Sequence, residues 1–470
     1  MITKSRLRNM LLWVSMALVS QSCFAQLNNP QFFPIAVWLQ NPNQAQAYKD
    51  AGINMYIGLW NELDPTQLAK LKNAGIYVIC EQTAFGLSTA GDTTIAGWLH
   101  GDEPDNAQWN STTQKWDPCV DPGDIISYYN TLKSNDPSRP VYLNLGRGVA
   151  DIRWNGRGTC TGAYEMYIEE LNGYIGGCDI VSFDIYPVNS SDAATKEKLW
   201  FVPKGIDSLR SWSSTPKPVW TWIETTKING SSNRKPTPEE VKAEVWMAII
   251  HGASGIGYFC HSWTPTFDEA ALLHDSTMIN NVAALNRTIS SLAPVLNSQS
   301  TTNYTSVNSS NAAVPVDFMT KQYGNDHYLF AVAMRNDTTS ATFTVPAGST
   351  IEVLGENRTI TESGGRFTDS FFNYEVHIYK VTAVASGITA LRENAEIVIF
   401  PNPATGLVQI SVPARVSDDA IITVYNSLGI AVLRSRNSQV IDLSGCAPGM
   451  YVVCVSSDQH ELKQKVLLLP

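Results

Sequence analysis

The chain has 470 residues, enough for about three domains at roughly 150 residues each. Hydrophobic residues make up 44% of the chain and charged residues 16%, against a usual charged share of about 25%, so an intrinsically disordered chain is excluded. The formal net charge is −10 and no basic block occurs, which argues against a nucleic-acid partner. Thirteen tryptophans are available to stack on flat ligands.

The N-terminus has the features of an export signal. A basic start is followed by an apolar run over residues 10–20, and Phe24-Ala25 ends a small-residue cleavage signal. We therefore expect residues 1–25 to be a signal peptide. A lipoprotein signal that uses Cys23 is the alternative. After this segment no apolar run of about 20 residues occurs, so no membrane span is expected.

The cysteines left after the signal are odd in number, although export favours disulfides. Cys119 and Cys160 fall in long loops and are candidates to pair with each other. Cys80, Cys178 and Cys260 adjoin apolar strands and are expected to be small buried side chains. No Cys-x-x-Cys or His-x-x-x-His spacing indicates a metal site, and none is predicted.

Between residues 33 and 297, strand-like runs alternate with helix-like segments. The runs are almost continuously apolar, as in parallel strands that are buried on both faces. Eight such strands in alternation with helices over about 265 residues are typical of a (β/α)8 barrel, which we predict for residues 26–298. The expected strands are Phe33–Gln40, Ile53–Trp60, Ile76–Gln82, Ile95–Gly101, Pro140–Gly146, Cys178–Tyr186, Pro218–Glu224 and Gly255–Trp263.

Two of the intervening helices have clear start signals. Asp64-Pro65 begins a helix that ends at Gly75. Thr237-Pro238 begins another, with Glu240 placed to complete a capping box. One unit fits the barrel pattern poorly, because residues 83–94 are rich in Gly and Thr and offer no clear helix.

Beyond residue 298 the pattern changes to short alternating runs, which are typical of antiparallel sheets. We predict a β-sandwich over residues 299–384 and favour a structural role for it over carbohydrate binding. A second, small all-β domain is predicted over residues 385–470. The fold class is therefore α/β: a TIM barrel followed by a β-sandwich and an all-β C-terminal domain.

A series of short motifs marks about the last 80 residues. In chain order these are Pro401-Asn402-Pro403, Gly406, Val424-Tyr425-Asn426, Gly429 and Pro448-Gly449-Met450-Tyr451, before a final strand at 461–468. Together they resemble the C-terminal sorting domain of the type IX secretion system. The resemblance implies that this machinery exports the chain across the outer membrane of a Gram-negative bacterium, to be secreted or attached to the cell surface. An ordinary all-β accessory module is the alternative.

Two strand ends carry glutamates at the mouth of the predicted barrel, where such barrels have their active sites. The fourth strand leads into Asp102, Glu103 and Pro104, and the seventh ends at Glu224. Strands four and seven face each other across the mouth. Two carboxylates on either side of a glycosidic bond are what glycoside hydrolysis needs.

With Glu103 and Glu224 in these places, the barrel resembles the clan A glycoside hydrolases. That superfamily has its acid/base glutamate after strand four, usually within Asn-Glu-Pro, and its nucleophilic glutamate after strand seven. The resemblance implies a retaining double displacement in which Glu224 attacks and Glu103 acts first as acid and then as base. Asp102 stands where the clan usually has the asparagine that contacts the sugar 2-hydroxyl, and it can accept such a bond.

Other residues at strand ends complete the expected site. The resemblance assigns Tyr186, after strand six, to a hydrogen bond with the nucleophile, and Trp263, after strand eight, to the floor beneath the sugar. Asp184 is expected in the inner layer of the barrel. Each aromatic residue is also compatible with simple packing. The remaining expected contacts are Asn144 for a sugar hydroxyl, Trp38 and Trp60 as an extension of the aromatic platform, and His100 as an orienting partner of Glu103.

The sequence thus favours a secreted glycoside hydrolase that cleaves O-glycosidic bonds in a β-linked polysaccharide or oligosaccharide, as a monomer and without a metal or organic cofactor. A non-catalytic surface glycan-binding protein on a decayed barrel is the rival, and a transglycosylase would use the same two glutamates. Glu62 and Glu81, after strands two and three, are rival carboxylates. The sugar, the linkage and endo or exo action stay open, because loops such as 105–123, which carries Trp109 and Trp116, decide them.

Overall fold

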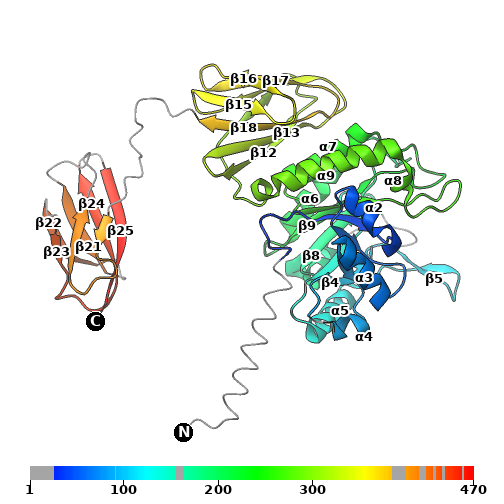
Figure 1. The fold of residues 1–470 in the computed structure, drawn as a ribbon, viewed down its shortest axis with the longest axis horizontal. Coiled ribbons are helices and arrows are strands. Elements are labelled where there is room, and N and C mark those ends of the chain that lie inside the picture. Colours follow the sequence, from blue (N-terminus) through cyan, green and yellow to red (C-terminus); the bar gives the residue numbers. More distant parts are fainter. Residues whose placement is uncertain are drawn as a thin grey trace, which may run out of the picture. The chain divides into compact units, whose positions relative to one another are not determined.

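The structure is a computed structural model that describes residues 26–89, 91–154, 164–383, 398–411, 420–426, 430–436, 440–457 and 460–469. The expected signal peptide lies outside these residues. The chain divides into two compact units, with the boundary after Ala383 (Figure 1).

The first unit contains a closed barrel of eight parallel strands, which confirms the predicted architecture. Each expected strand overlaps one observed strand, and the order around the barrel, β1-β10-β9-β8-β7-β4-β3-β2, follows the chain. The strands are β1 (Ile35–Trp38), β2 (Met55–Ile57), β3 (Tyr77–Cys80), β4 (Ile95–Asp102), β7 (Val141–Leu145), β8 (Ile180–Asp184), β9 (Val219–Glu224) and β10 (Gly255–Phe259).

Helices connect most of the strands. The two helix starts predicted at Asp64 and Thr237 are confirmed, because both residues cap a helix. Asp64 Oδ1 accepts a hydrogen bond from Gln67 N at 2.8 Å, and Thr237 Oγ1 accepts one from Glu240 N at 3.2 Å. Residues 83–94, expected to lack a helix, contain the single short turn α4. The helices are α2 (Ala45–Asp50), α3 (Pro65–Ala74), α4 (Ala84–Ser88), α5 (Pro122–Asn135), α6 (Phe201–Trp212), α7 (Pro238–Ile250), α8 (Ala271–His274) and α9 (Ser276–Leu296).

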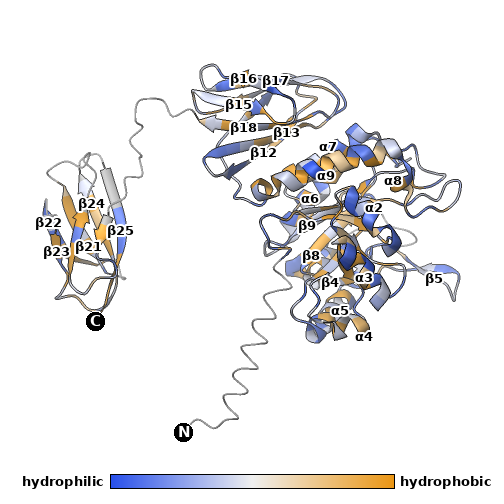
Figure 2. Ribbon diagram, in the orientation of Figure 1, coloured by the Kyte–Doolittle hydropathy of each residue, from blue (hydrophilic) through white to orange (hydrophobic). Residues whose placement is uncertain are grey.

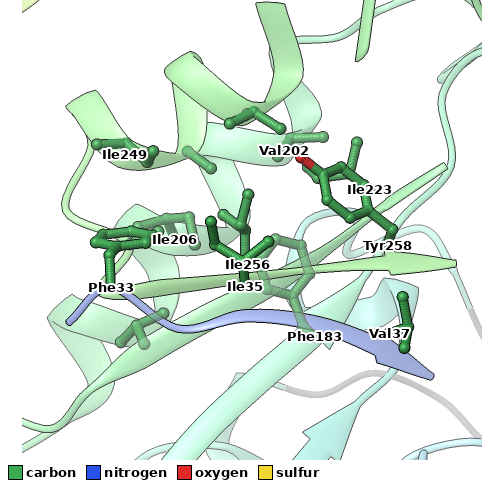
Figure 3. Close-up of a cluster of buried hydrophobic side chains, with 14 of the residues drawn as sticks. Phe33, Ile35, Val37, Phe183, Val202, Ile206, Ile223, Ile249, Ile256 and Tyr258 are labelled. Carbon is green, nitrogen blue, oxygen red and sulfur yellow. The ribbon is translucent and has the colours of Figure 1, made fainter. Parts of the chain in front are cut away.

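Alternate residues along the strands point to opposite sides, and they form two apolar layers: one inside the barrel, and one between the strands and the surrounding helices. Trp220 and Trp222 of β9 point into the barrel, where Gly255 and Gly257 of β10 leave room for their rings; a Cβ on Gly257 would lie 2.2 Å from the Trp222 ring. Residues of the opposite parity, such as Ile223, pack outward against α6 and α7 (Figure 3). Figure 2 shows hydrophobic and hydrophilic residues mixed along α9, as expected for a helix with one buried face.

The β-sandwich belongs to the same unit as the barrel. Its two antiparallel sheets have the orders β11-β14-β17 and β12-β13-β18-β15-β16. The strands are β11 (Val307–Ser309), β12 (Val316–Tyr323), β13 (Asp326–Ala333), β14 (Thr339–Thr344), β15 (Ser349–Val353), β16 (Arg358–Thr361), β17 (Arg366–Phe371) and β18 (Val376–Ala383).

One hydrophobic cluster spans the barrel and the sandwich, in addition to the separate cores inside each of them. Trp246 of α7 stacks on Phe330 of β13, with ring centroids 5.5 Å apart and planes 20° from parallel. Both rings are fully buried, and burial of each stabilises the fold by roughly 1.5–3 kcal/mol. His251, directly after α7, lies between Asp207 of the barrel at 2.9 Å and Asp317 of the sandwich at 3.1 Å. These contacts favour the structural role expected for the sandwich.

The second unit is all-β, as predicted. Its two antiparallel sheets have the orders β19-β20-β23 and β22-β21-β24-β25. It has a core of its own that includes Val408, Val424 and Val453. The strands are β19 (Val398–Phe400), β20 (Leu407–Ser411), β21 (Ile421–Tyr425), β22 (Ala431–Arg436), β23 (Val440–Asp442), β24 (Gly449–Ser457) and β25 (His460–Leu468).

The described cysteines of the barrel are of two kinds, buried free thiols and one disulfide-bonded residue. Cys80, Cys178 and Cys260 are buried free thiols. Cys119 is disulfide-bonded, while its expected partner Cys160 lies outside the described residues, so their pairing stays a prediction. Within the part of the chain that the structure describes, no helix has the length and apolar character needed to cross a membrane.

Candidate active site

The C-terminal ends of the barrel strands surround a cavity of about 760 Å³. This is the end at which barrels of this type carry their active sites. Aromatic rings combined with acidic and amide groups suit a ligand that has both apolar faces and hydroxyl groups. The aromatic lining is Trp38, Trp60, Trp154, Tyr186, Trp222, Phe259, His261 and Trp263, and the acidic and amide lining is Asp102, Glu103, Asp184, Asp192, Asn106, Asn144, Asn189 and Asn229.

Glu103 lines this cavity directly after β4. Its φ is 44°, in the left-handed region that residues other than glycine rarely adopt. Hydrogen bonds hold this conformation: Glu103 N donates to Asn144 O at 2.9 Å. Glu103 O accepts from Asn106 N and from Gln108 Nε2, each at 3.0 Å. Strained residues that are held this firmly cluster at functional sites, so the backbone also marks Glu103 as a functional candidate.

The Glu103 carboxyl lies among other carboxyl groups. A Cβ atom on Gly146 would lie 3.1 Å from Glu103 Oε1, so the glycine leaves the space beside this carboxyl. Burial, followed by the charges of Glu103 and Asp102, raises the pKa of Asp184 well above its usual range. Burial and the Glu103 charge also raise the pKa of Asp105 to about 7. The cluster therefore holds protons at pH values where isolated carboxyls have lost them.

A chain of hydrogen bonds across three strands orients Asp102. Asn144 Nδ2 donates to Asp102 Oδ1 at 2.9 Å, and Ser182 Oγ donates to Asn144 Oδ1 at 2.7 Å. The strand register places Asp102 opposite Asn144 and Asn144 opposite Ser182. Asn144 lines the cavity, but both ends of its amide are engaged within the protein. The structure thus gives Asn144 the task of orienting Asp102, where the sequence suggested a direct contact with a sugar hydroxyl.

Glu224, the last residue of β9, is not among the residues that line the cavity. Its side chain is fully buried. Glu224 Oε1 accepts from Val188 N at 2.6 Å, and Oε2 accepts from Asn189 N at 2.7 Å and Asn189 Nδ2 at 2.6 Å. Asn189 itself does line the cavity. In this structure Glu224 is covered and does not line the cavity beside Glu103, because the segment after β8 folds over the end of β9. Its role as nucleophile stays a prediction.

A second buried carboxyl, Glu244 on α7, interacts with Glu224. Burial raises the pKa of Glu224 to about 7, although the hydrogen bonds from Asn189 and Val188 oppose the rise. Burial and the charge of Glu224 raise the pKa of Glu244 well above its usual range. A buried pair of interacting carboxyls retains a proton near neutral pH, since two negative charges cannot be stabilised there together.

The expected aromatic platform is present in the wall of the cavity. Trp60 and Trp263 are 45% and 46% exposed, so each presents ring surface to solvent. Trp60 stacks on His261 with centroids 5.3 Å apart, and Trp263 meets the same imidazole edge to face at 5.5 Å. Trp38 lies deeper, where it meets Trp222 edge to face at 5.0 Å. Trp60 and Trp263 thus have surface available for a sugar face, whereas Trp38 closes the bottom of the cavity.

Tyr186 lines the cavity, where its ring meets Phe259 at 5.1 Å. Burial and the charge of Asp184 raise the pKa of Tyr186, so its hydroxyl keeps its proton. The hydrogen bonds that reach Glu224 come from Val188 and Asn189. The structure therefore places Tyr186 beside Asp184, where the sequence suggested a partner of the nucleophile.

His100 points away from the cavity, which corrects its expected role of orienting Glu103. Its Nε2 donates to Ile125 O at 2.7 Å, and its ring meets Tyr128 edge to face at 5.0 Å, both on α5 outside the barrel. The reason is a β-bulge in β4: the register with β7 shifts between Leu99 and Gly101, which leaves His100 as the extra residue, with its side chain against α5. The rival glutamates Glu62 and Glu81 are exposed and do not belong to the cavity lining.

The cavity wall contains an arginine, Arg147, that was not among the site residues expected from the sequence. Arg147 follows β7 by two residues, and its Nη2 donates to Asp151 Oδ2 at 2.9 Å and to Asp192. The guanidinium carbon lies 4.8 Å from the centroid of the Trp154 ring. Its position after the fifth barrel strand is the signal that could have found it, since the mouth of the barrel is built from such residues. Asn189 gave no comparable signal, because it lies inside a loop.

These groups define the chemistry that the cavity can perform. The carboxyl cluster can hold and transfer protons, and the rings can stack on a sugar face. Among the described residues, no group of three or more His, Cys, Asp or Glu side chains forms an arrangement that could hold a metal ion.

Comparison with known proteins bears on both units. Residues 398–468 match the family model of the secretion system C-terminal sorting domain, which confirms the expected sorting domain and indicates secretion or cell-surface attachment. No curated protein matches the chain.

Among solved structures the chain is similar to AmyP in complex with maltose, at 11% identity over 78% of this chain and 99% of that one, with a TM-score of 0.48. It is similar to the α-amylase of Geobacillus thermoleovorans complexed with acarbose, at 11% identity over 75% and 98%, with a TM-score of 0.46. It is also similar to a catalytic mutant of Gan42B, a GH42 β-galactosidase from G. stearothermophilus, at 10% identity over 74% and 98%, with a TM-score of 0.46. At these identities no activity or residue role is transferred to this chain.

Proposed function

We propose that the chain is an exported glycoside hydrolase that cleaves O-glycosidic bonds in a β-linked glycan. The observation that carries the proposal is the cavity at the strand ends, where aromatic walls meet buried polar atoms. Arg147 Nε and Asp184 Oδ1 are buried there without a hydrogen-bond partner among the described residues. One is a donor and the other an acceptor, and a small shift of either side chain towards the cavity, which both residues line, would let a sugar hydroxyl group bond to it.

Glu103 is the proposed acid/base. In the first step it protonates the leaving oxygen while the glycosidic C–O bond breaks, and in the second it takes a proton from the water that attacks the anomeric carbon. Asp184 and Asp105 keep protons in its surroundings at neutral pH, as their raised pKa values indicate. Asp102, oriented by Asn144, is placed to accept a bond from a sugar hydroxyl.

Glu224 is the proposed nucleophile, on the strand position that the clan resemblance assigns. Its carboxylate would bond to the anomeric carbon as the leaving group departs, and water would later break that bond. In the conformation described here, this attack first requires Val188 and Asn189 to release the Glu224 carboxylate towards the cavity. The proposal therefore includes a movement of the segment after β8 when substrate binds.

Export completes the proposal. The sorting domain supports delivery to the cell exterior, where a carbohydrate polymer is accessible. A cleaved signal over residues 1–25 would supply the first step, and the type IX machinery the second. The glycan is the proposed partner of the barrel, and no nucleic-acid or membrane partner is proposed.

The test is a panel of plant, algal and microbial glycans incubated with the secreted chain, with released sugars as the readout. Glu103→Gln keeps the shape of the side chain and removes its acidity, and we expect release to fall by about 10²–10⁴-fold. Glu62→Gln is the matched control, because Glu62 also follows a barrel strand but is exposed outside the cavity lining. Equal release by wild type and Glu103→Gln would contradict the proposal.

One observation favours a second candidate, a glycan-binding protein without hydrolytic activity. Glu224 is buried behind Asn189, so the conformation described here presents Glu103 to the cavity without the second proposed carboxylate. On this alternative the cavity retains its aromatic walls and binds a glycan chain. Retention of a polysaccharide with no sugar released, by wild type and Glu103→Gln alike, would favour it.

A further inference from the structure

A hairpin that projects beside the cavity carries two exposed tryptophans. β5 (Gln108–Asn110) and β6 (Lys115–Asp117) form a separate two-stranded antiparallel sheet, and Figure 1 shows β5 standing away from the barrel. Trp109 and Trp116 are directly opposite each other in the register, so their side chains lie on the same face of the hairpin. The rings meet edge to face, with centroids 5.2 Å apart.

The ring pair stays largely in solvent. Trp109 is 50% exposed and Trp116 is 44% exposed. Large aromatic rings stabilise a fold most when they are buried, so these half-exposed tryptophans, the middle pair of the two-stranded sheet, contribute less than buried rings would. Their edge-to-face contact helps to hold the two short strands together. The remaining ring surface is available to a ligand.

Both ends of the hairpin are attached to the segment that carries Glu103. At the start of the hairpin, Gln108 Nε2 donates to Glu103 O at 3.0 Å and to Asn106 O at 2.7 Å. Beyond its end, Val120 N donates to Pro104 O at 2.9 Å. Trp109 is six residues from Glu103, which bounds its distance from that residue at roughly 20 Å. The tryptophan pair is therefore held within a short chain distance of the proposed acid/base.

We propose that Trp109 and Trp116 form a distal platform that binds a glycan chain extending out of the cavity, so that the substrate is a polymer. The inference rests on the proposed function. Exposed flat rings are suited to the C–H faces of sugars, and the hydrogen bond from Gln108 to the backbone of Glu103 ties the hairpin to the residue that lines the cavity. Trp109 and Trp116 do not line the cavity, so a substrate that ends inside it would not contact them. The platform thus distinguishes a polysaccharide from a short oligosaccharide.

Protection from oxidation tests the proposal on the unmodified chain. Exposed tryptophans are oxidised with N-bromosuccinimide and quantified by peptide mass spectrometry, in the presence of soluble β-glucan, xylan or laminarin, or of the trisaccharide of each. We expect at least one polymer to protect Trp109 and Trp116, and the trisaccharides to leave both reactive. Trp263 in the cavity wall is the internal reference, protected by the polymer and by its trisaccharide. Unchanged reactivity of Trp109 and Trp116 with all three polymers would overturn the platform.

A variant series gives a second measurement. We expect the double variant W109A/W116A to raise KM for the polymer about tenfold, the effect of one well-placed aromatic contact, with kcat on its trisaccharide unchanged. Tyr323→Ala, which removes a similarly exposed ring from the sandwich, is the control and should change neither. An equal change for polymer and trisaccharide would indicate a disturbed cavity and would overturn the platform. Polymer protection without any sugar release would refute hydrolysis while leaving the platform intact.

Discussion

The ends of β4 and β9 carry the two glutamates that the sequence singles out, and their surroundings are opposite. Glu103 follows β4 with a strained backbone, and its carboxyl lies at the cavity beside Gly146. Glu224 ends β9 without entering the cavity lining, and its carboxyl is bound by two backbone amides and one side-chain amide. Equivalent places on a barrel therefore do not ensure equivalent access to substrate.

The difference comes from the segments that follow the strands. After β4 the chain turns immediately at Glu103-Pro104 and leaves the carboxyl uncovered. After β8 it passes over the end of β9, where Val188 and Asn189 donate their amides to Glu224. A carboxylate that accepts three hydrogen bonds is firmly positioned, but it is not free to attack. Substitutions at the two strand ends should show whether this difference persists when substrate is bound.

The largest expected effect is that of Glu224→Gln on turnover. If the segment after β8 releases Glu224 to attack, the substitution removes the nucleophile and should lower kcat on the order of 10⁴-fold. Azide should then partly rescue Glu224→Gly, giving a glycosyl azide of inverted configuration. Both results would be measured on the glycan that the panel identifies.

Glu244→Gln is the matched control for that experiment, because Glu244 belongs to the same buried pair but comes from α7. We expect its kcat to stay within about tenfold of wild type, since the residue does not contact the sugar. Equal, small losses in both variants, together with lower thermal stability, would mean that Glu224 only holds the segment after β8.

A smaller effect is expected from Gly146→Ala, at a position that directly follows β7 and lies beside Glu103. The added methyl group would lie 3.1 Å from Glu103 Oε1 and 2.8 Å from Asn106 Nδ2, so both side chains must shift by a few tenths of an ångström. We expect kcat to fall about tenfold with little change in KM, because a small misplacement of an acid/base affects the transition state more than binding. An unchanged kcat would show that the Glu103 carboxyl occupies another position when substrate is bound.

The smallest effect concerns the dependence of stability on pH. The folded pKa of Glu224, about 7, is raised above its ordinary value of 4.5, so between these values the folded chain binds more protons than the unfolded chain. This contribution is fully present below pH 4.5 and is lost as the pH rises through 7. Urea unfolding from pH 5 to pH 8 should show a steeper decline for wild type than for Glu224→Gln. Parallel curves would mean that Glu224 is not buried in solution.

The sequence was sufficient for the barrel because buried parallel strands must be apolar throughout, and it marked the positions of strand ends for the same reason. The location of Trp60 and Trp263 in the cavity wall was predicted from their places after barrel strands. Access of a side chain was not predictable, since it depends on how a neighbouring loop folds, as Asn189 shows for Glu224. The position of His100 was not predictable from alternation either, because a β-bulge between Leu99 and Gly101 interrupts it: His100 lies against α5, whereas Asp102, two residues further on, lines the cavity. Arg147 could have been predicted as a cavity residue, because it follows a barrel strand by two residues, just as Glu103 directly follows β4.

The stack of Trp246 on Phe330 has a consequence for how this protein can be divided. A cut near residue 298, where the character of the sequence changes, would separate these rings and expose a large apolar area on α7. Barrel and sandwich should therefore melt in a single calorimetric transition, and either piece expressed alone should aggregate. The smallest transferable part that includes the barrel is the barrel and sandwich together, so recombination or protein engineering that moves one of them must move both.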